Sequence, residues 1–178
     1  MKRAHFFALI GAFTAVFVLL SVLAGLVVRK SETNSQSLSG FPVYINEIMS
    51  SNSIYYDNRG MAYDWVELYN SADMDIRLSQ YKLTDSERAV RYIFPDDAVI
   101  PARGYYVVWC NRGAGEGYAN FSIAKAGGEV ICLLNSRSVI IDRVVTLPLD
   151  ENTVMARDEE GQWQVLPYGS PGFENGEA

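Results

Sequence analysis

The seven residues Asp64–Asn70 (DWVELYN) constrain the fold of this chain most, because their side chains alternate with a period of two. Val66 and Leu68 face one side of the segment. Trp65 and Glu67 face the other side, which is the pattern of a β-strand with one face on a core. The acidic Glu67 lies between aromatic residues on that second face, so we expect the face to be partly covered and the carboxylate to have a hydrogen-bond partner.

Other short segments of similar composition follow at intervals near ten residues, separated by turn residues and without an amphipathic helix. About eight or nine strands are expected, and they predict an all-β sandwich. The continuous aromatic and β-branched run Tyr105–Cys110 predicts a central strand covered on both sides. Phe121 and Ile123 are expected to flank a short strand, and the alternation slips at Glu47, as at a bulge. The other predicted strands are Val43–Met49, Arg91–Phe94, Val130–Leu134, Val139–Val145, Thr153–Arg157 and Trp163–Leu166, and residues 76–85 are expected to form one strand or a bent pair of strands.

Residues 4–28 form an almost wholly apolar run of 25 residues, which is longer than the roughly 20 residues that cross a bilayer as a helix. We expect an uncleaved single-pass anchor, because a secretory signal has an apolar core of only about 7 to 15 residues. Cleavage after Ala24 stays open as the alternative. Basic residues flank the run on both sides in nearly equal number, so the positive-inside rule gives little indication of the orientation. We expect a short N-terminal tail inside and an extracytoplasmic domain at the cell membrane.

The rest of the chain divides into a tether and one domain. Residues 31–40 (SETNSQSLSG) are polar apart from Leu38, a composition that predicts a flexible linker. We therefore expect an anchor at residues 1–30, a linker at 31–40, a β-sandwich domain at 41–175 and a short tail at 176–178.

The charge of the predicted domain excludes one class of partner. Residues 41–178 carry 11 Lys and Arg against 20 Asp and Glu, a net charge of -9. This acidic surface repels phosphates, so no nucleic acid partner is expected. Cys110 and Cys132 each lie in an apolar run. They predict two buried thiols, and a single bridge between neighbouring strands stays open.

Several short motifs occur in a fixed order along the predicted domain. They are Ile45–Ile48 (INEI), Asp64–Asn70, Leu83–Asp85 (LTD), Phe94–Asp96 (FPD), Asn120–Phe121, Gly128–Glu129, Ile141–Asp142 and Ser170–Gly172 (SPG) with Asn175. In this order the chain resembles the lamin tail domain family, the immunoglobulin-like sandwich of nuclear lamins that recurs in bacterial extracellular proteins. The chain lacks a heptad rod, a basic localisation run and a prenylation signal, so the resemblance implies the bacterial, membrane-anchored form rather than a nuclear filament.

The resemblance also implies which residues carry the family signature and that the module has no catalytic residues of its own. The signature positions in this chain are Asn46, Glu47, Asp64, Trp65, Glu67, Asn70, Asp85, Pro171 and Gly172. We expect Glu67 and the pair Asn46-Glu47 to be internal hydrogen-bonding groups that fix the fold, rather than ligands.

No catalytic, metal or cofactor site is expected. The one histidine, His5, lies in the apolar run, so a histidine-based triad is impossible. A calcium site of Asp57, Asn58 and Asp64 is chemically allowed, but its spacing matches no known loop. The glycine-rich loop at residues 112–117 lacks the Lys-Ser or Lys-Thr ending of a phosphate-binding loop.

Tyr55, Tyr56 and Tyr63 surround one loop and form a possible interaction surface, either packed over the end of the sandwich or stacked on a ligand. We expect a membrane-anchored, extracytoplasmic binding or scaffolding module that contacts lipid through residues 4–28 and a protein or cell-envelope partner through its domain. The alternatives are a carbohydrate or cell-wall binding domain, or an accessory subunit of a membrane-associated enzyme.

Overall fold

The computed structural model describes residues 40–86, 89–113 and 115–176. Within these residues the regular secondary structure is β-strand, apart from one short 3-10 helix at Leu78–Gln80. The strands are β1 (Val43–Met49), β2 (Asp64–Asn70), β3 (Ile76–Arg77), β4 (Lys82–Thr84), β5 (Tyr92–Ile93), β6 (Val99–Ile100), β7 (Tyr105–Cys110), β8 (Val130–Leu134), β9 (Ile140–Val145), β10 (Val154–Arg157) and β11 (Trp163–Leu166).

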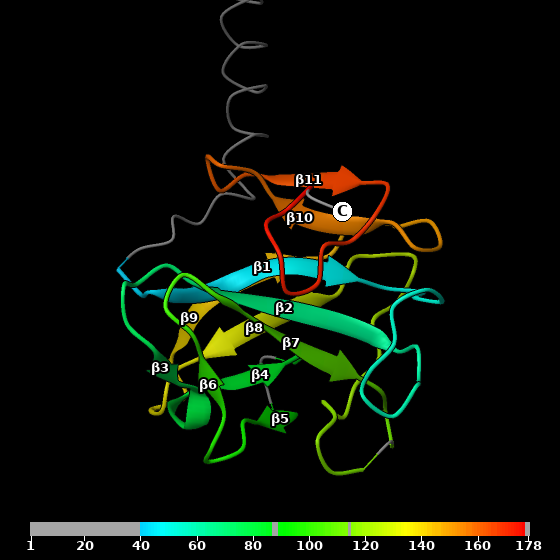
Figure 1. Ribbon diagram of the computed structural model, residues 1–178. Helices are drawn as coiled ribbons and strands as arrows, with labels where there is room; N and C mark the ends of the chain where they lie inside the picture. Colours follow the sequence, from blue (N-terminus) through cyan, green and yellow to red (C-terminus); the bar gives the residue numbers. More distant parts are fainter. Residues whose placement is uncertain (1–39, 87–88, 114, 177–178) are drawn as a thin grey trace, which may run out of the picture. The chain divides into compact units, whose positions relative to one another are not determined.

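Two antiparallel sheets form the sandwich, as Figure 1 shows. The larger sheet has the order β11-β10-β1-β2-β7, and the smaller has the order β5-β4-β8-β9. A two-stranded ribbon, β3-β6, stands beside them. The predicted all-β, immunoglobulin-like sandwich is confirmed. The eleven strands exceed the expected eight or nine because several are only two residues long, too short to give an alternation.

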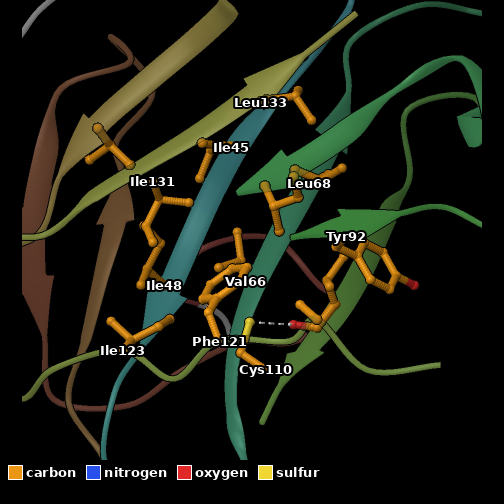
Figure 2. Close-up of a cluster of buried hydrophobic side chains, with 14 of the residues drawn as sticks. Ile45, Ile48, Val66, Leu68, Tyr92, Cys110, Phe121, Ile123, Ile131 and Leu133 are labelled. Atoms are coloured by element: carbon orange, nitrogen blue, oxygen red, sulfur yellow. Dashed lines mark hydrogen bonds between the residues drawn. The ribbon is translucent and has the colours of Figure 1, made fainter. Parts of the chain in front are cut away.

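The core lies between the two sheets, where alternate side chains of their strands meet. In Figure 2, Ile45 and Val66 from the larger sheet point toward Ile131 and Leu133 from the smaller one. Phe121, which is fully buried, fills one end of this layer. Burial of a large apolar side chain contributes roughly 1.5–3 kcal/mol, so this layer supplies the main driving force for folding.

A bulge in β1 changes which residues face outward. The register between β1 and β2 shifts between Ile45 and Glu47, one position before the expected slip. Ile45 and Ile48 consequently both reach the core, whereas Asn46 and Glu47 lie side by side on the outer face of the larger sheet. Glu47 then faces Glu67 across the strand pair.

A segment that follows β11 covers part of that outer face. We call residues 169–176 the C-terminal strap; it is the red segment that crosses β1 and β2 in Figure 1. The backbone N–H of Ser170 donates to Glu47, and that of Gly172 donates to Glu67 at 2.6 Å. The outer face of the sheet is therefore divided into a covered central part and open parts beside it.

A buried ion pair joins the two sheets. Nη2 of Arg157 in β10 lies 3.2 Å from both carboxylate oxygens of Asp142 in β9. The same carboxylate accepts the N–H of Ile45, and Arg157 Nε donates to the Ile45 carbonyl at 2.7 Å. Arg157 Nη1 donates to the Gly161 carbonyl at 2.8 Å, so all three guanidinium nitrogens and both carboxylate oxygens have partners. These hydrogen bonds offset the cost of removing two charges from water.

Two expectations about individual segments were wrong. The run Tyr105–Cys110 is β7, an edge strand of the larger sheet rather than a central one. Its outer-face side chains are half-buried because they pack against neighbours on β2 and against loops, not against a further strand. The segment around Phe121 and Ile123 is not a strand, because the Ile123 N–H donates to the Asp64 carboxylate instead of to a sheet.

The remaining expectations concern the two cysteines and the apolar N-terminal run. Cys110 and Cys132 are both buried and no disulfide joins them, so the prediction of two buried thiols is confirmed. The predicted anchor at residues 4–28 and most of the linker lie outside the described residues. No helix among the residues that the structure describes is long and apolar enough to span a bilayer.

Candidate functional site

Two buried carboxylates anchor the C-terminal strap. Glu47 and Glu67 are both fully buried at paired positions of β1 and β2. Burial raises the pKa of Glu47 to about 7 and that of Glu67 to about 8, although the hydrogen bonds from Ser170 and Gly172 act in the opposite direction. The two acids therefore hold the chain's own backbone and present no carboxylate oxygen to a substrate.

Other residues of the expected family signature also bind the chain itself. The Asn46 side chain donates to Glu67 at 3.0 Å and exchanges two hydrogen bonds with Asn175 of the strap. The Asn70 amide donates to the carbonyls of Met74 and Pro101, and so closes the turn after β2. The Asn70 side chain thereby satisfies backbone carbonyls of the turn, whereas Asn46 links the Glu67 carboxylate to the strap.

The last signature positions lie at the ends of the strands. Asp64 accepts the N–H groups of Ser51 and Ile123, both at 2.9 Å. Asp85 lies 3.5 Å from Arg91 in a partly exposed ion pair. Trp65 is fully buried beneath the strap at Gly169, Pro171 is half-buried in the strap, and Gly172 has a φ of 87°, a conformation that glycine adopts without strain.

The three loop tyrosines differ in their surroundings. Tyr55 is half-buried, donates to the Gly169 carbonyl at 2.6 Å and stands edge-on to Trp65. Tyr63 stands edge-on to Tyr118, with ring centroids 5.4 Å apart. Tyr56 is 63% exposed, and its hydroxyl donates to a carbonyl of its own loop. Two of the three rings are thus used inside the protein.

An open hollow of about 600 Å³ lies on the outer face of the larger sheet, beside the strap. We call it the tyrosine hollow, because its floor is a row formed by Tyr44 on β1, Tyr69 on β2 and Tyr105 on β7. The sheet register places the three residues directly opposite one another. Their ring centroids are 5.5 Å and 4.9 Å apart, so the row is continuous across three strands.

Acidic residues surround this floor. Glu159 and Glu160 in the turn between β10 and β11 are exposed, and Glu174 of the strap is exposed on another side. Burial raises the pKa of the Tyr105 hydroxyl to about 12, and the nearby charge of Glu174 contributes to that rise. The hollow therefore combines aromatic faces with negative charge.

The guanidinium that lines the hollow does not neutralise this charge. Arg157 is buried between rings, 5.7 Å from the centroid of Tyr44 and 4.4 Å from that of Trp163. Its charge is compensated by Asp142. A cation–π contact of this kind fixes the position of Tyr44 at the end of the row.

A second hollow, of about 340 Å³, lies near the tyrosine loop. Here the Tyr118 hydroxyl donates to Asp57 at 2.5 Å, and the Arg59 guanidinium lies 5.0 Å from the Tyr118 ring centroid. Asp57 also accepts two N–H groups of its own loop. Asp64, which the calcium hypothesis groups with Asp57, accepts the N–H groups of Ser51 and Ile123 instead. No group of three or more metal-binding side chains occurs in the part of the chain that the structure describes.

Sequence reasoning missed the tyrosine hollow. Tyr44, Tyr69 and Tyr105 lie 25 and 36 residues apart, and only the register of the strands brings them together. The available signal was that each occupies an outward position of a predicted strand.

Comparison with known protein families matches residues 36–147 to the Lamin Tail Domain. The match includes the strands from β1 to β9, whereas β10, β11 and the strap follow it. A search of curated proteins gave no match.

Proposed function

We propose a binding or scaffolding role without catalysis for this chain, because it belongs to the lamin tail domain family, whose domains are immunoglobulin-like modules. We further propose that residues 4–28 hold the domain at the cell membrane and that the domain faces away from the cytoplasm. The observation that carries the proposal is the tyrosine hollow, an open aromatic surface outside the core.

The chemistry of the hollow supports binding. Tyrosine rings offer a large contact area with little conformational freedom to lose, and they are enriched where proteins bind one another. The sheet holds all three rings from rigid strands rather than from a loop. A partner would therefore meet a preformed surface, which lowers the entropic cost of association.

The use of the buried acids supports a role without catalysis. Catalytic carboxylates need an open path to a substrate and a second group to exchange protons with it. Glu47 and Glu67 lie beneath the strap and accept from Ser170 and Gly172. The exposed acids of the hollow stand on a turn and on the strap, where no base or nucleophile is paired with them among the described residues.

The membrane part of the proposal comes from the sequence alone. The apolar run at residues 4–28 is long enough to cross a bilayer, and the linker of residues 31–40 spans on the order of 17 Å as a random coil. The domain would then stand close to the membrane surface, where a cell-envelope protein is within its reach.

The experiment is affinity isolation with the full chain, carrying a C-terminal tag, from detergent-solubilised membranes of the source cells. A discrete partner should be retained by the wild type and by Tyr56→Leu, but lost from Tyr105→Leu. Tyr56 supplies the matched control, because it is an exposed tyrosine outside the hollow. Protease added to intact cells should digest the domain if it faces outward.

Two results would overturn the proposal. The first is hydrolase or nuclease turnover by the purified full chain that a carboxylate substitution abolishes. The second is retention of the same partners by wild type and Tyr105→Leu. Retention on peptidoglycan that depends on Tyr56 would instead identify a cell-wall binding domain that uses the tyrosine loop.

A further inference from the structure

We propose that the tyrosine hollow binds an extended segment of a partner protein that carries lysine or arginine side chains. The inference rests on the proposed function, since it names the chemistry of the partner that the binding module would take. Three observations carry it: the geometry of the aromatic row, the charge around it and the length of the floor.

The aromatic row is suited to cations. A lysine ammonium or an arginine guanidinium is attracted to the face of a tyrosine ring within about 6 Å of its centroid. Arg157 already makes this contact, 5.7 Å from the centroid of Tyr44. Tyr69 and Tyr105 are half-buried, and both line the hollow.

The charge around the hollow favours the same class of ligand. The acids that line it are Asp158, Glu159, Glu160 and Glu174, and the only base among the lining residues, Arg157, is compensated by Asp142. Asp158 also accepts the N–H of Gln162 and so shapes the turn that carries its two neighbours.

One further cation stands near the row. Arg103 interacts with Tyr69, but it is paired with Asp73 at 2.8 Å and adds no uncompensated charge. Opposite charge at the rim of a binding surface raises the rate of encounter and rejects partners of like charge. Anionic sugars, phosphates and acidic peptides are therefore disfavoured.

The floor has the length of a peptide. Neighbouring strands are about 4.8 Å apart, so a row across three strands extends about 10 Å, which is the length of three residues of extended chain. A partner segment crossing Tyr44, Tyr69 and Tyr105 could thus place alternate basic side chains between the rings and the acids of the rim. A small cation alone would leave most of the 600 Å³ to water.

The experiment is isothermal titration calorimetry of the full chain, kept in mild detergent, with the peptide acetyl-GKGKGK-amide. The matched probes are the same peptide with glutamate or glutamine in place of lysine. We expect the lysine peptide to bind, the other two not to bind, and the affinity to fall as ionic strength rises.

Two pairs of variants locate the site. Glu159→Gln with Glu160→Gln should weaken binding about fivefold to tenfold, as expected for two exposed ion pairs. Asp96→Asn with Asp97→Asn removes the same charge from an exposed turn elsewhere and should change the affinity less than twofold. Tyr105→Leu should weaken binding, whereas Tyr56→Leu should not. Circular dichroism and the thermal midpoint identify any variant that has lost its fold, and the turn variants give the answer independently of Tyr105.

The inference is wrong if the glutamate or glutamine peptide binds as well as the lysine peptide, or if both charge-removing pairs weaken binding equally. It is also wrong if no peptide binds while affinity isolation still shows a partner that depends on Tyr105. In that last case the binding module stands and its ligand is not basic. If no peptide binds and affinity isolation shows no partner that depends on Tyr105, the proposed function itself is wrong.

Discussion

The replacement Glu67→Gln tests how the strap is held. Glu67 is fully buried and its pKa is raised from 4.5 to about 8, chiefly by desolvation. Glutamine has nearly the same shape and resembles the neutral acid. It can still accept the N–H of Gly172, which lies 2.6 Å from the carboxylate, but its amide nitrogen cannot accept from Asn46, so that one hydrogen bond is lost.

The sign follows from proton binding. Between pH 4.5 and pH 8 the folded protein binds more protons at Glu67 than the unfolded chain does, so the free energy of unfolding is highest below pH 4.5 and falls as pH rises toward 8. At about 1.4 kcal/mol per pKa unit, the total loss is on the order of 5 kcal/mol. That is a large part of the 5–15 kcal/mol by which a typical domain is stable.

The Glu67→Gln variant should not lose this free energy of unfolding as pH rises, because glutamine does not ionise. At pH 5 we expect Glu67→Gln to be within about 1 kcal/mol of the wild type, which is the scale of one hydrogen bond. At pH 8.5 the variant should be the more stable protein by several kcal/mol. A smaller pH dependence should remain through Glu47, whose pKa of about 7 is also raised. The two acids are paired across the strands and titrate together.

The assay is urea unfolding of the full chain in mild detergent at pH 5.0 and pH 8.5, followed by tryptophan fluorescence. All three tryptophans of the chain lie in the described domain, so the signal reports that domain alone. The control is Glu160→Gln, the same chemical change at an exposed position. If wild type and Glu67→Gln lose equal stability between the two pH values, within 1 kcal/mol, the reasoning about the buried acids is refuted.

Three further predictions concern stability and accessibility. Gly169→Ala should lower the free energy of unfolding by about 1–3 kcal/mol, because the new Cβ would lie 2.8 Å from the Trp65 ring; an unchanged urea midpoint would contradict this contact. Arg157→Met should cost about 3–5 kcal/mol by leaving the buried Asp142 carboxylate uncompensated, and restoration of part of that loss by adding Asp142→Asn would identify the charge as the cause. The two buried thiols should react with a thiol reagent only at the rate at which the domain opens, and rapid labelling of the native chain would show that they are accessible.

Strands with only one face on the core were predictable, because their apolar and polar residues alternate. Asp64–Asn70 was placed correctly for this reason, and the cover over Trp65 and Glu67 explains why its second face combines aromatic and acidic residues. Tyr105–Cys110 was misplaced because a continuous apolar run does not tell whether its second face meets a strand or loops and aromatic neighbours.

The candidate site was harder to predict than the fold. The tyrosine hollow depends on strand register and on a turn that follows β10, neither of which local composition specifies. The loop tyrosines are close together in sequence, but Tyr55 bonds to Gly169 and Tyr63 packs against Tyr118, and local composition predicts neither partner.

The claim that the hollow is the recognition surface can be tested directly by photo-crosslinking in intact cells. A benzoylphenylalanine at position 105 of the full chain should give one discrete adduct with another protein, and the adduct should weaken when Glu159 and Glu160 are both changed to Gln. The same probe at position 56 should give none. Equal adducts at both positions, or an adduct at 56 alone, would contradict the account.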